Sequence, residues 1–147
     1  MDRIGSLLLG ALLLMTSGAH GATMAEEARA LGIIGKWASG GADCGQPASK
    51  DNSFYIWFVS GSDVFLRREF GVTTDQNKVL RLEPVGDVVE IDVNFGASSA
   101  TRTMGYKILS DQAMHIKYNH DSHGGYTIKD FHFTATGKPT VPARKCG

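Results

Sequence analysis

The sequence predicts an all-β protein: an antiparallel up-and-down meander of about eight strands that closes, fully or partly, into a barrel. Three observations predict it. Short apolar stretches recur at even spacing, brief segments with turn chemistry separate them, and several stretches alternate apolar with polar residues. Tight successive hairpins favour an up-and-down order over a Greek key, which needs a long return connection.

Residues 1–21 have the composition of a secretory signal peptide. An Asp-Arg pair precedes an uncharged apolar run over residues 4–15, and small residues follow it. The run is about 12 residues long, whereas a helix that crosses a bilayer needs roughly 20. We expect cleavage after Gly21, which leaves one mature domain over residues 22–147, although sites two residues earlier and four residues later are also compatible.

The chain has only two cysteines, Cys44 and Cys146. In an exported protein they predict one disulfide bond, and the expected location is the periplasm or the outside of the cell. Such a bond would close a loop of about 100 residues, worth roughly 4–5 kcal/mol in the chain-entropy model. No segment after the signal is long and apolar enough for a transmembrane helix, so we expect no membrane insertion after cleavage.

The mature chain is expected to begin with a short helix over residues 25–31, followed by strands only. The predicted strands cover residues 35–38, 54–59, 64–70, 79–85, 88–95, 102–109, 113–118 and 126–134. Their connections are short and carry the residues that favour turns, including Gly61, Gly86 and Gly124.

Alternation assigns most strands one apolar and one polar face, which is typical of a sheet with one side in solvent. The residues expected to point inward are Ile56, Phe58, Leu80, Leu82, Ile91, Val93, Met104, Tyr106 and Ile116. In the last predicted strand the apolar residues move from one face to the other, and a β-bulge near Lys129 and Asp130 would reset its register.

The stretch 54–59 is apolar on both faces. Either its second face is covered, for example by the predicted helix, or Tyr55 and Trp57 form an exposed aromatic patch that binds a protein partner.

The segment Gly35–Trp37 reads Gly-Lys-Trp and lies just before the meander. It resembles the G-x-W motif that opens the first strand of lipocalins. That resemblance implies an eight-stranded barrel with Trp37 plugging its closed end and an arginine packed over the ring. The chain is also similar, over roughly residues 35–58, to small exported lipocalin-like proteins of Gram-negative bacteria. In those proteins a Cys, a Pro and an Asn follow the motif, here Cys44, Pro47 and Asn52.

A candidate ligand site comes from residues expected inside the barrel. Arg68 and Arg102 lie on otherwise apolar strand faces, and a buried guanidinium needs a counter-charge. A ligand carboxylate would supply it; alternatively each side chain reaches solvent at a strand end, or Arg68 pairs with an internal acid. Met104, Tyr106 and Met114 would complete an adaptable apolar interior.

Other chemistry is poorly supported. His120 and His123 share a loop with Asp121, but their spacing fixes no third metal ligand. The chain has no nucleophile elbow or phosphate loop. Lys plus Arg equals Asp plus Glu, 15 each, which argues against a nucleic-acid partner. We therefore expect no enzyme, metal or cofactor, but a binding protein for a small amphipathic ligand, anionic if an arginine holds it. The alternative is a small protein-binding module, such as a hydrolase inhibitor.

Overall fold

The computed structural model describes residues 21–96 and 100–147, so the predicted signal peptide lies, except for Gly21, outside the described residues. One short helix, α1 (Met24–Ala30), precedes the strands, which all belong to one antiparallel sheet. The strands are β1 (Gly35–Ala38), β2 (Phe54–Ser60), β3 (Asp63–Phe70), β4 (Thr73–Val85), β5 (Val88–Asn94), β6 (Thr101–Ser110), β7 (Ala113–Asp121), β8 (Tyr126–Lys129), β9 (His132–Phe133) and β10 (Ala143–Lys145).

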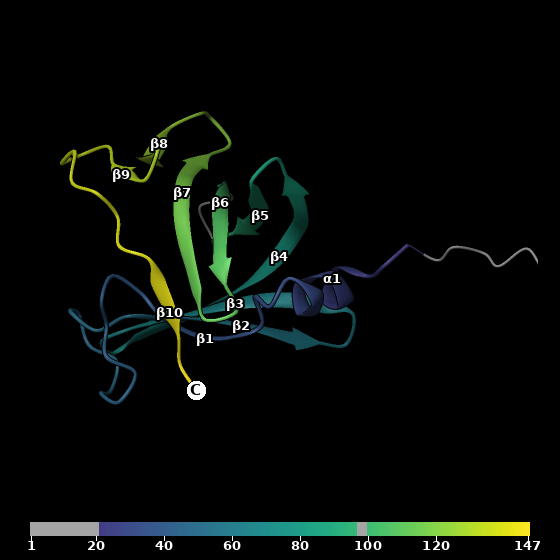
Figure 1. Ribbon diagram of the computed structural model, residues 1–147, viewed down its shortest axis with the longest axis horizontal. Helices are drawn as coiled ribbons and strands as arrows, with labels where there is room; N and C mark the ends of the chain where they lie inside the picture. Colours follow the sequence, from purple (N-terminus) through teal and green to yellow (C-terminus); the bar gives the residue numbers. More distant parts are fainter. Residues whose placement is uncertain (1–20, 97–99) are drawn as a thin grey trace, which may run out of the picture.

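The sheet closes into an eight-stranded barrel, as predicted. Strands β1 to β7 pair in chain order, and the C-terminal β10 joins the two ends (Figure 1). Trp37 of β1 pairs with Lys145 of β10, while Met114 of β7 pairs with Ala143. The closing strand is thus β10, which the sequence did not predict, and β8 and β9 extend from β7 as a separate hairpin.

The expectation of one bulged strand over residues 126–134 is wrong. Asp130 and Phe131 have φ of 48° and 64°, and Lys129 pairs directly with His132 across them. Positive φ at both central residues is the signature of a type I′ turn, which joins two strands tightly. The change of parity in the sequence therefore marks a hairpin turn between β8 and β9.

Two register shifts change which side chains face inward, and the first corrects the predicted inward set. Between Val79 and Arg81 the β4–β5 pairing shifts, so Leu82 is buried whereas Leu80 is 50% exposed. In the β6–β7 pairing, Gly105 faces Tyr118 but Tyr106 faces Ile116. One extra residue, Lys117, is thus accommodated in β7, which changes the face of every residue after it.

Strand β2 faces the opposite way from the prediction. Trp57 is fully buried in the barrel core, whereas Ile56 and Phe58, expected inside, belong to the outer face. There Phe58 stacks on Phe65 of β3 with ring centroids 5.6 Å apart. The assignments of Ile91, Val93, Met104 and Tyr106 to the core are confirmed, and Ile116 is partly buried against it.

Helix α1 begins at a capping box between Thr23 and Glu26, which satisfies backbone N–H groups at its first turn. It packs beside β3 and β4 and buries Ala25 and Ala28 in the same core as Trp57. No helix in the described ranges is long and apolar enough to cross a membrane.

The predicted disulfide bond between Cys44 and Cys146 is present and spans 102 residues of sequence. The loop that carries Cys44 is organised by Asn52. The Asn52 amide accepts a hydrogen bond from the backbone N–H of Asp43 at 2.7 Å and donates to the carbonyl of Pro47 at 2.9 Å. The disulfide bond therefore ties an ordered loop to Cys146, the residue that follows β10.

Candidate ligand cavity

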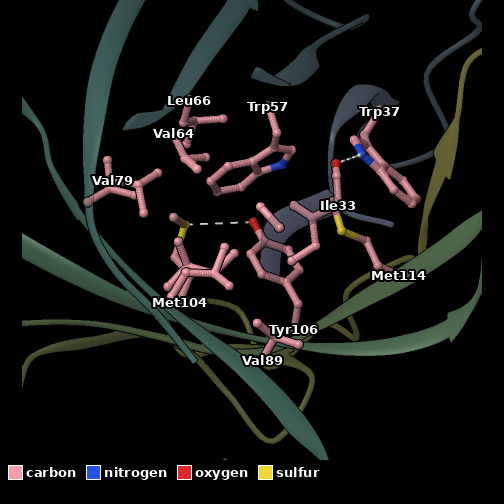
Figure 2. Close-up of a cluster of buried hydrophobic side chains, with 14 of the residues drawn as sticks. Ile33, Trp37, Trp57, Val64, Leu66, Val79, Val89, Met104, Tyr106 and Met114 are labelled. Carbon is pink, nitrogen blue, oxygen red and sulfur yellow. Dashed lines mark hydrogen bonds between the residues drawn. The ribbon is translucent and has the colours of Figure 1, made fainter. Parts of the chain in front are cut away.

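One end of the interior is packed around Trp37, which is 1% exposed. Its indole N–H donates a 2.7 Å hydrogen bond to the carbonyl of Ile33, as Figure 2 shows. The ammonium of Lys145 lies 5.3 Å from the ring centroid. Trp37 is thus a buried core residue with a cation over its ring, and that cation is a lysine where the resemblance led us to expect an arginine.

A cavity of about 340 Å³ lies among β2, β6, β7, β10 and the β8–β9 hairpin. Its lining residues are Ser39, Gly40, Tyr55, Met104, Tyr106, Ile116, Asn119, Ile128, Phe133, Thr140, Val141 and Ala143. Most of them present carbon, some present neutral polar atoms, and none of these described residues carries a charge. The volume is at the small end of the range for ligand pockets, roughly 300–1,000 Å³.

The cavity lies where β7 changes partners. Near its start β7 pairs with β10 through Met114, and near its end it pairs with β8 through Asn119. Between these pairings Ile116 faces the cavity. The extra residue Lys117 then brings Asn119 onto the lining in place of Tyr118.

Residues 134–142, which we call the strap, run from β9 to β10 along this side of the barrel; Figure 1 shows them in yellow. The strap is fixed at Thr140, which is 6% exposed. Its backbone N–H donates to the carbonyl of Phe131 at 2.7 Å, and its own carbonyl lies 3.0 Å from the ring Nε2 of His115. The His115 and Phe131 rings also pack at 4.6 Å between centroids. These contacts hold one wall of the cavity in place.

Tyr106 places a phenol on the cavity lining, although only 4% of its surface is exposed. Within the described residues its hydroxyl has one hydrogen-bond partner, the thioether sulfur of Met104 at 3.7 Å (Figure 2). Burial raises the pKa of this phenol strongly, and the neighbouring Tyr55 raises it further, whereas Arg68 lowers it. The hydroxyl therefore stays neutral and remains available as a donor.

Arg68 does not line the cavity. It binds Asp75 of β4 through two guanidinium nitrogens, with Nε 2.9 Å from Oδ1, and its guanidinium lies 4.1 Å from the Phe95 ring centroid. Asn77 donates to the same carboxylate at 3.0 Å. The hydrogen bonds from Arg68 hold the pKa of Asp75 below its ordinary value. The internal acid that would satisfy Arg68 is thus present.

Arg102 also lies off the cavity lining. Its Nη1 is 3.4 Å from the Oδ1 of Asn119, which does line the cavity. In the backbone register of β6 and β7, Arg102 lies opposite Asp121. The positive charge of Arg102 lowers the pKa of Asp121, after the larger effect of hydrogen bonds from the backbone of Gly125 and His123.

The structure brings only part of the predicted site together. Met104 and Tyr106 line the cavity, whereas Met114 is buried in the adjoining core. Of the two alternatives for residues 54–59, the exposed aromatic patch at Tyr55 and Trp57 does not form, because Trp57 is buried and Tyr55 lines the cavity. Sequence reasoning also missed the contribution of the hairpin and the strap. The turn at Asp130 and Phe131 forms the hairpin, and the extra residue Lys117 brings Asn119 to the lining. The alternation of apolar and polar residues alone reveals neither.

The outer face of β4 to β7 carries a separate polar network. Arg81 binds Glu83, Glu90 and Asp92, and the Tyr118 hydroxyl donates to Glu90. Hydrogen bonds from Tyr118 and then from Arg81 lower the pKa of Glu90. Over the described part of the chain, no three His, Cys, Asp or Glu side chains are grouped so that they could hold a metal ion.

No protein-family model matches this chain, and neither a curated protein nor a solved structure matches it.

Proposed function

We propose that the protein is an exported, non-enzymatic binding protein that holds one small amphipathic molecule inside its barrel. The observation that carries the proposal is the cavity of about 340 Å³ beside the β8–β9 hairpin. An eight-stranded barrel is either filled by side chains or has room for one small ligand. Here the core around Trp37 and Trp57 is filled, and the space bounded by the strap is not.

The lining supports a ligand that is mainly apolar and uncharged. Ile116, Ile128 and Phe133 offer carbon surface, and Met104 offers a flexible side chain that adapts to shape. A charged group would lose its hydration without gaining a counter-charge, which is costly. An anionic end group, expected if an arginine were free, gains no support from Arg68, which is already bound to Asp75. Arg102 lies off the lining, with its Nη1 3.4 Å from the Oδ1 of Asn119.

Export is part of the same proposal. A disulfide bond between Cys44 and Cys146 suits an oxidising compartment, and residues 1–21 read as a signal peptide. We accordingly place the mature protein in the periplasm or outside the cell.

The proposal is tested with protein purified without denaturation from the envelope fraction of its own host. Organic extraction followed by mass spectrometry is expected to recover a small neutral molecule from the wild type. The matched variants are Val141→Trp, which puts an indole at the cavity, and Val72→Trp, which alters the exposed β3–β4 turn. Equal recovery from both variants, or no molecule from the wild type, would contradict ligand storage in this cavity.

A further inference from the structure

We propose that the cavity selects a neutral molecule bearing a carbonyl oxygen, and that the hydroxyl of Tyr106 binds this oxygen at the inner end. This inference rests on the proposed function and adds to it the chemical class of the ligand and its orientation.

The hydroxyl of Tyr106 has unmet hydrogen-bonding capacity. Buried polar groups in proteins nearly always have a partner, and a phenol offers one donor and accepts at its oxygen. In the described residues the Tyr106 hydroxyl has only the Met104 sulfur, at 3.7 Å, and a thioether is a weak acceptor. An acceptor oxygen brought by a ligand would give this donor a strong partner.

The described lining residues are all uncharged, and Arg68, whose charge acts on Tyr106, is neutralised by Asp75. Arg102 lies off the lining and approaches it only at Asn119, with its Nη1 3.4 Å from Oδ1. A carboxylate bound beside Tyr106 would therefore be buried without a counter-ion, whereas a ketone, ester or amide oxygen has a much smaller desolvation cost. Because burial raises the pKa of Tyr106, the phenol stays protonated and can donate to such an oxygen.

The residues that line the cavity differ in burial. Met104 and Tyr106 are 3% and 4% exposed, whereas Phe133 and Val141 are 44% and 55% exposed. The other buried hydroxyl on the lining, that of Thr140, is already bonded to the carbonyl of Phe131 at 3.0 Å. The Tyr106 hydroxyl thus lies among the most buried lining residues, and carbon surface lies toward the opening. A ligand would enter with its oxygen first and leave its apolar body against the hairpin and the strap.

Three naphthalenes of matched shape test the inference: 2-acetylnaphthalene, 2-isopropylnaphthalene and 2-naphthoate. Each competes with the neutral fluorophore N-phenyl-1-naphthylamine for the wild type. We expect the acetyl compound to bind roughly tenfold more tightly than the hydrocarbon, which is the size of effect typical of one buried hydrogen bond. We expect 2-naphthoate to bind no better than the hydrocarbon.

Tyr106→Phe removes one hydroxyl and keeps the ring. It is expected to abolish the preference for the acetyl compound over the hydrocarbon. Tyr126→Phe, at an exposed tyrosine off the cavity lining, is the matched control and should keep the preference. Thermal unfolding of each variant checks that the fold is retained.

A second readout separates a direct bond from an effect on folding. The carbonyl stretch of bound 2-acetylnaphthalene, measured by infrared difference spectroscopy, should lie at lower wavenumber in the wild type than in Tyr106→Phe. An unchanged stretch would overturn the assignment of Tyr106.

The remaining outcomes are distinct. Equal binding of the acetyl and isopropyl compounds, or tightest binding of 2-naphthoate, overturns the inference and leaves ligand binding in the cavity standing. Failure of the fluorophore and all three naphthalenes to bind overturns the inference together with the proposed function.

Discussion

Lys145 bridges the first and last segments of the barrel by placing its ammonium 5.3 Å from the centroid of the Trp37 ring and 2.9 Å from the carbonyl of Gly32. Its aliphatic stem passes Gly35, where an added Cβ would lie only 2.7 Å from the Lys145 Cε. Gly35 also has a φ of 139°, a conformation that glycine adopts readily and other residues rarely do. The Gly-Lys-Trp segment therefore fits this site for two physical reasons.

Replacing Lys145 with Met should lower the free energy of unfolding by about 1–2 kcal/mol, because a cation–π contact and a hydrogen bond are lost. Urea denaturation measures the change. Lys138→Met, at an exposed strap position, is the control and should be near neutral. Equal effects of the two substitutions would show that the Lys145 contacts do not stabilise the barrel.

Gly35→Ala is expected to destabilise the protein by at least about 1 kcal/mol through strain at positive φ and through contact with Lys145. In a Lys145→Ala background the cost should fall, because the stem that meets the new methyl is shortened. A double-mutant cycle measures this coupling, and a coupling energy of zero would contradict the close approach.

Removal of the disulfide by Cys44→Ala with Cys146→Ala should lower the free energy of unfolding by roughly 4–5 kcal/mol. The bond closes a long loop in the unfolded chain and so lowers the entropy of the unfolded state, and the variant regains that entropy. The far-ultraviolet circular dichroism should remain that of a β protein, because the core does not depend on the bond. Non-reducing peptide mapping of the wild type must recover the two cysteines as one linked pair. Two free thiols would refute the bond.

Thr140→Val should cost about 1–3 kcal/mol, because it removes a buried hydroxyl that lies 3.0 Å from the carbonyl of Phe131 and 2.9 Å from Nε2 of His115. The strap should then open more often, seen as faster hydrogen exchange at residues 134–142 and faster release of the fluorophore. Thr136→Val, at an exposed position of the same strap, is the control. Unchanged exchange in Thr140→Val would contradict the role of Thr140 in holding the strap.

Stability should fall in acid. The pKa of Asp75 is held below its ordinary value of 3.8 by Arg68, so the folded state binds this proton less readily than the unfolded chain. The stabilisation is complete above about pH 4 to 5, and it is lost as the pH falls through the lowered folded-state pKa. Urea midpoints between pH 6 and pH 2 should drop less steeply for Asp75→Asn than for the wild type. If the urea midpoints of the two proteins fell equally steeply with pH, the Arg68–Asp75 pair would not contribute to stability.

Much of the fold follows from local pattern. The turns and alternating stretches predict the order of β2 to β7, and two cysteines in a chain with a predicted signal peptide predict their pairing. Strand β10 could not be read in the same way, because Ala143–Lys145 has no strand pattern of its own and is held by pairing with β1 and β7. Closure of the barrel is what makes it a strand.

The site was harder to predict than the fold, because single-residue shifts decide which side chains face inward. Met104 and Tyr106 were identified, since β6 alternates regularly around them. The extra residue Lys117 brings Asn119 to the cavity, and the Asp130–Phe131 turn folds β9 back along β8. Such shifts depend on how neighbouring strands close around the interior, and this information is not local to any one strand.

Titration of N-phenyl-1-naphthylamine into the purified protein tests whether the barrel holds a small neutral molecule beside the strap. We predict saturable enhancement of fluorescence with one site per chain for the wild type and for Val72→Trp. Val141→Trp should show binding weakened at least roughly tenfold, because its indole competes for the cavity and tenfold corresponds to about 1.4 kcal/mol. No saturable binding to the wild type, or equal affinity in all three proteins, would contradict the claim.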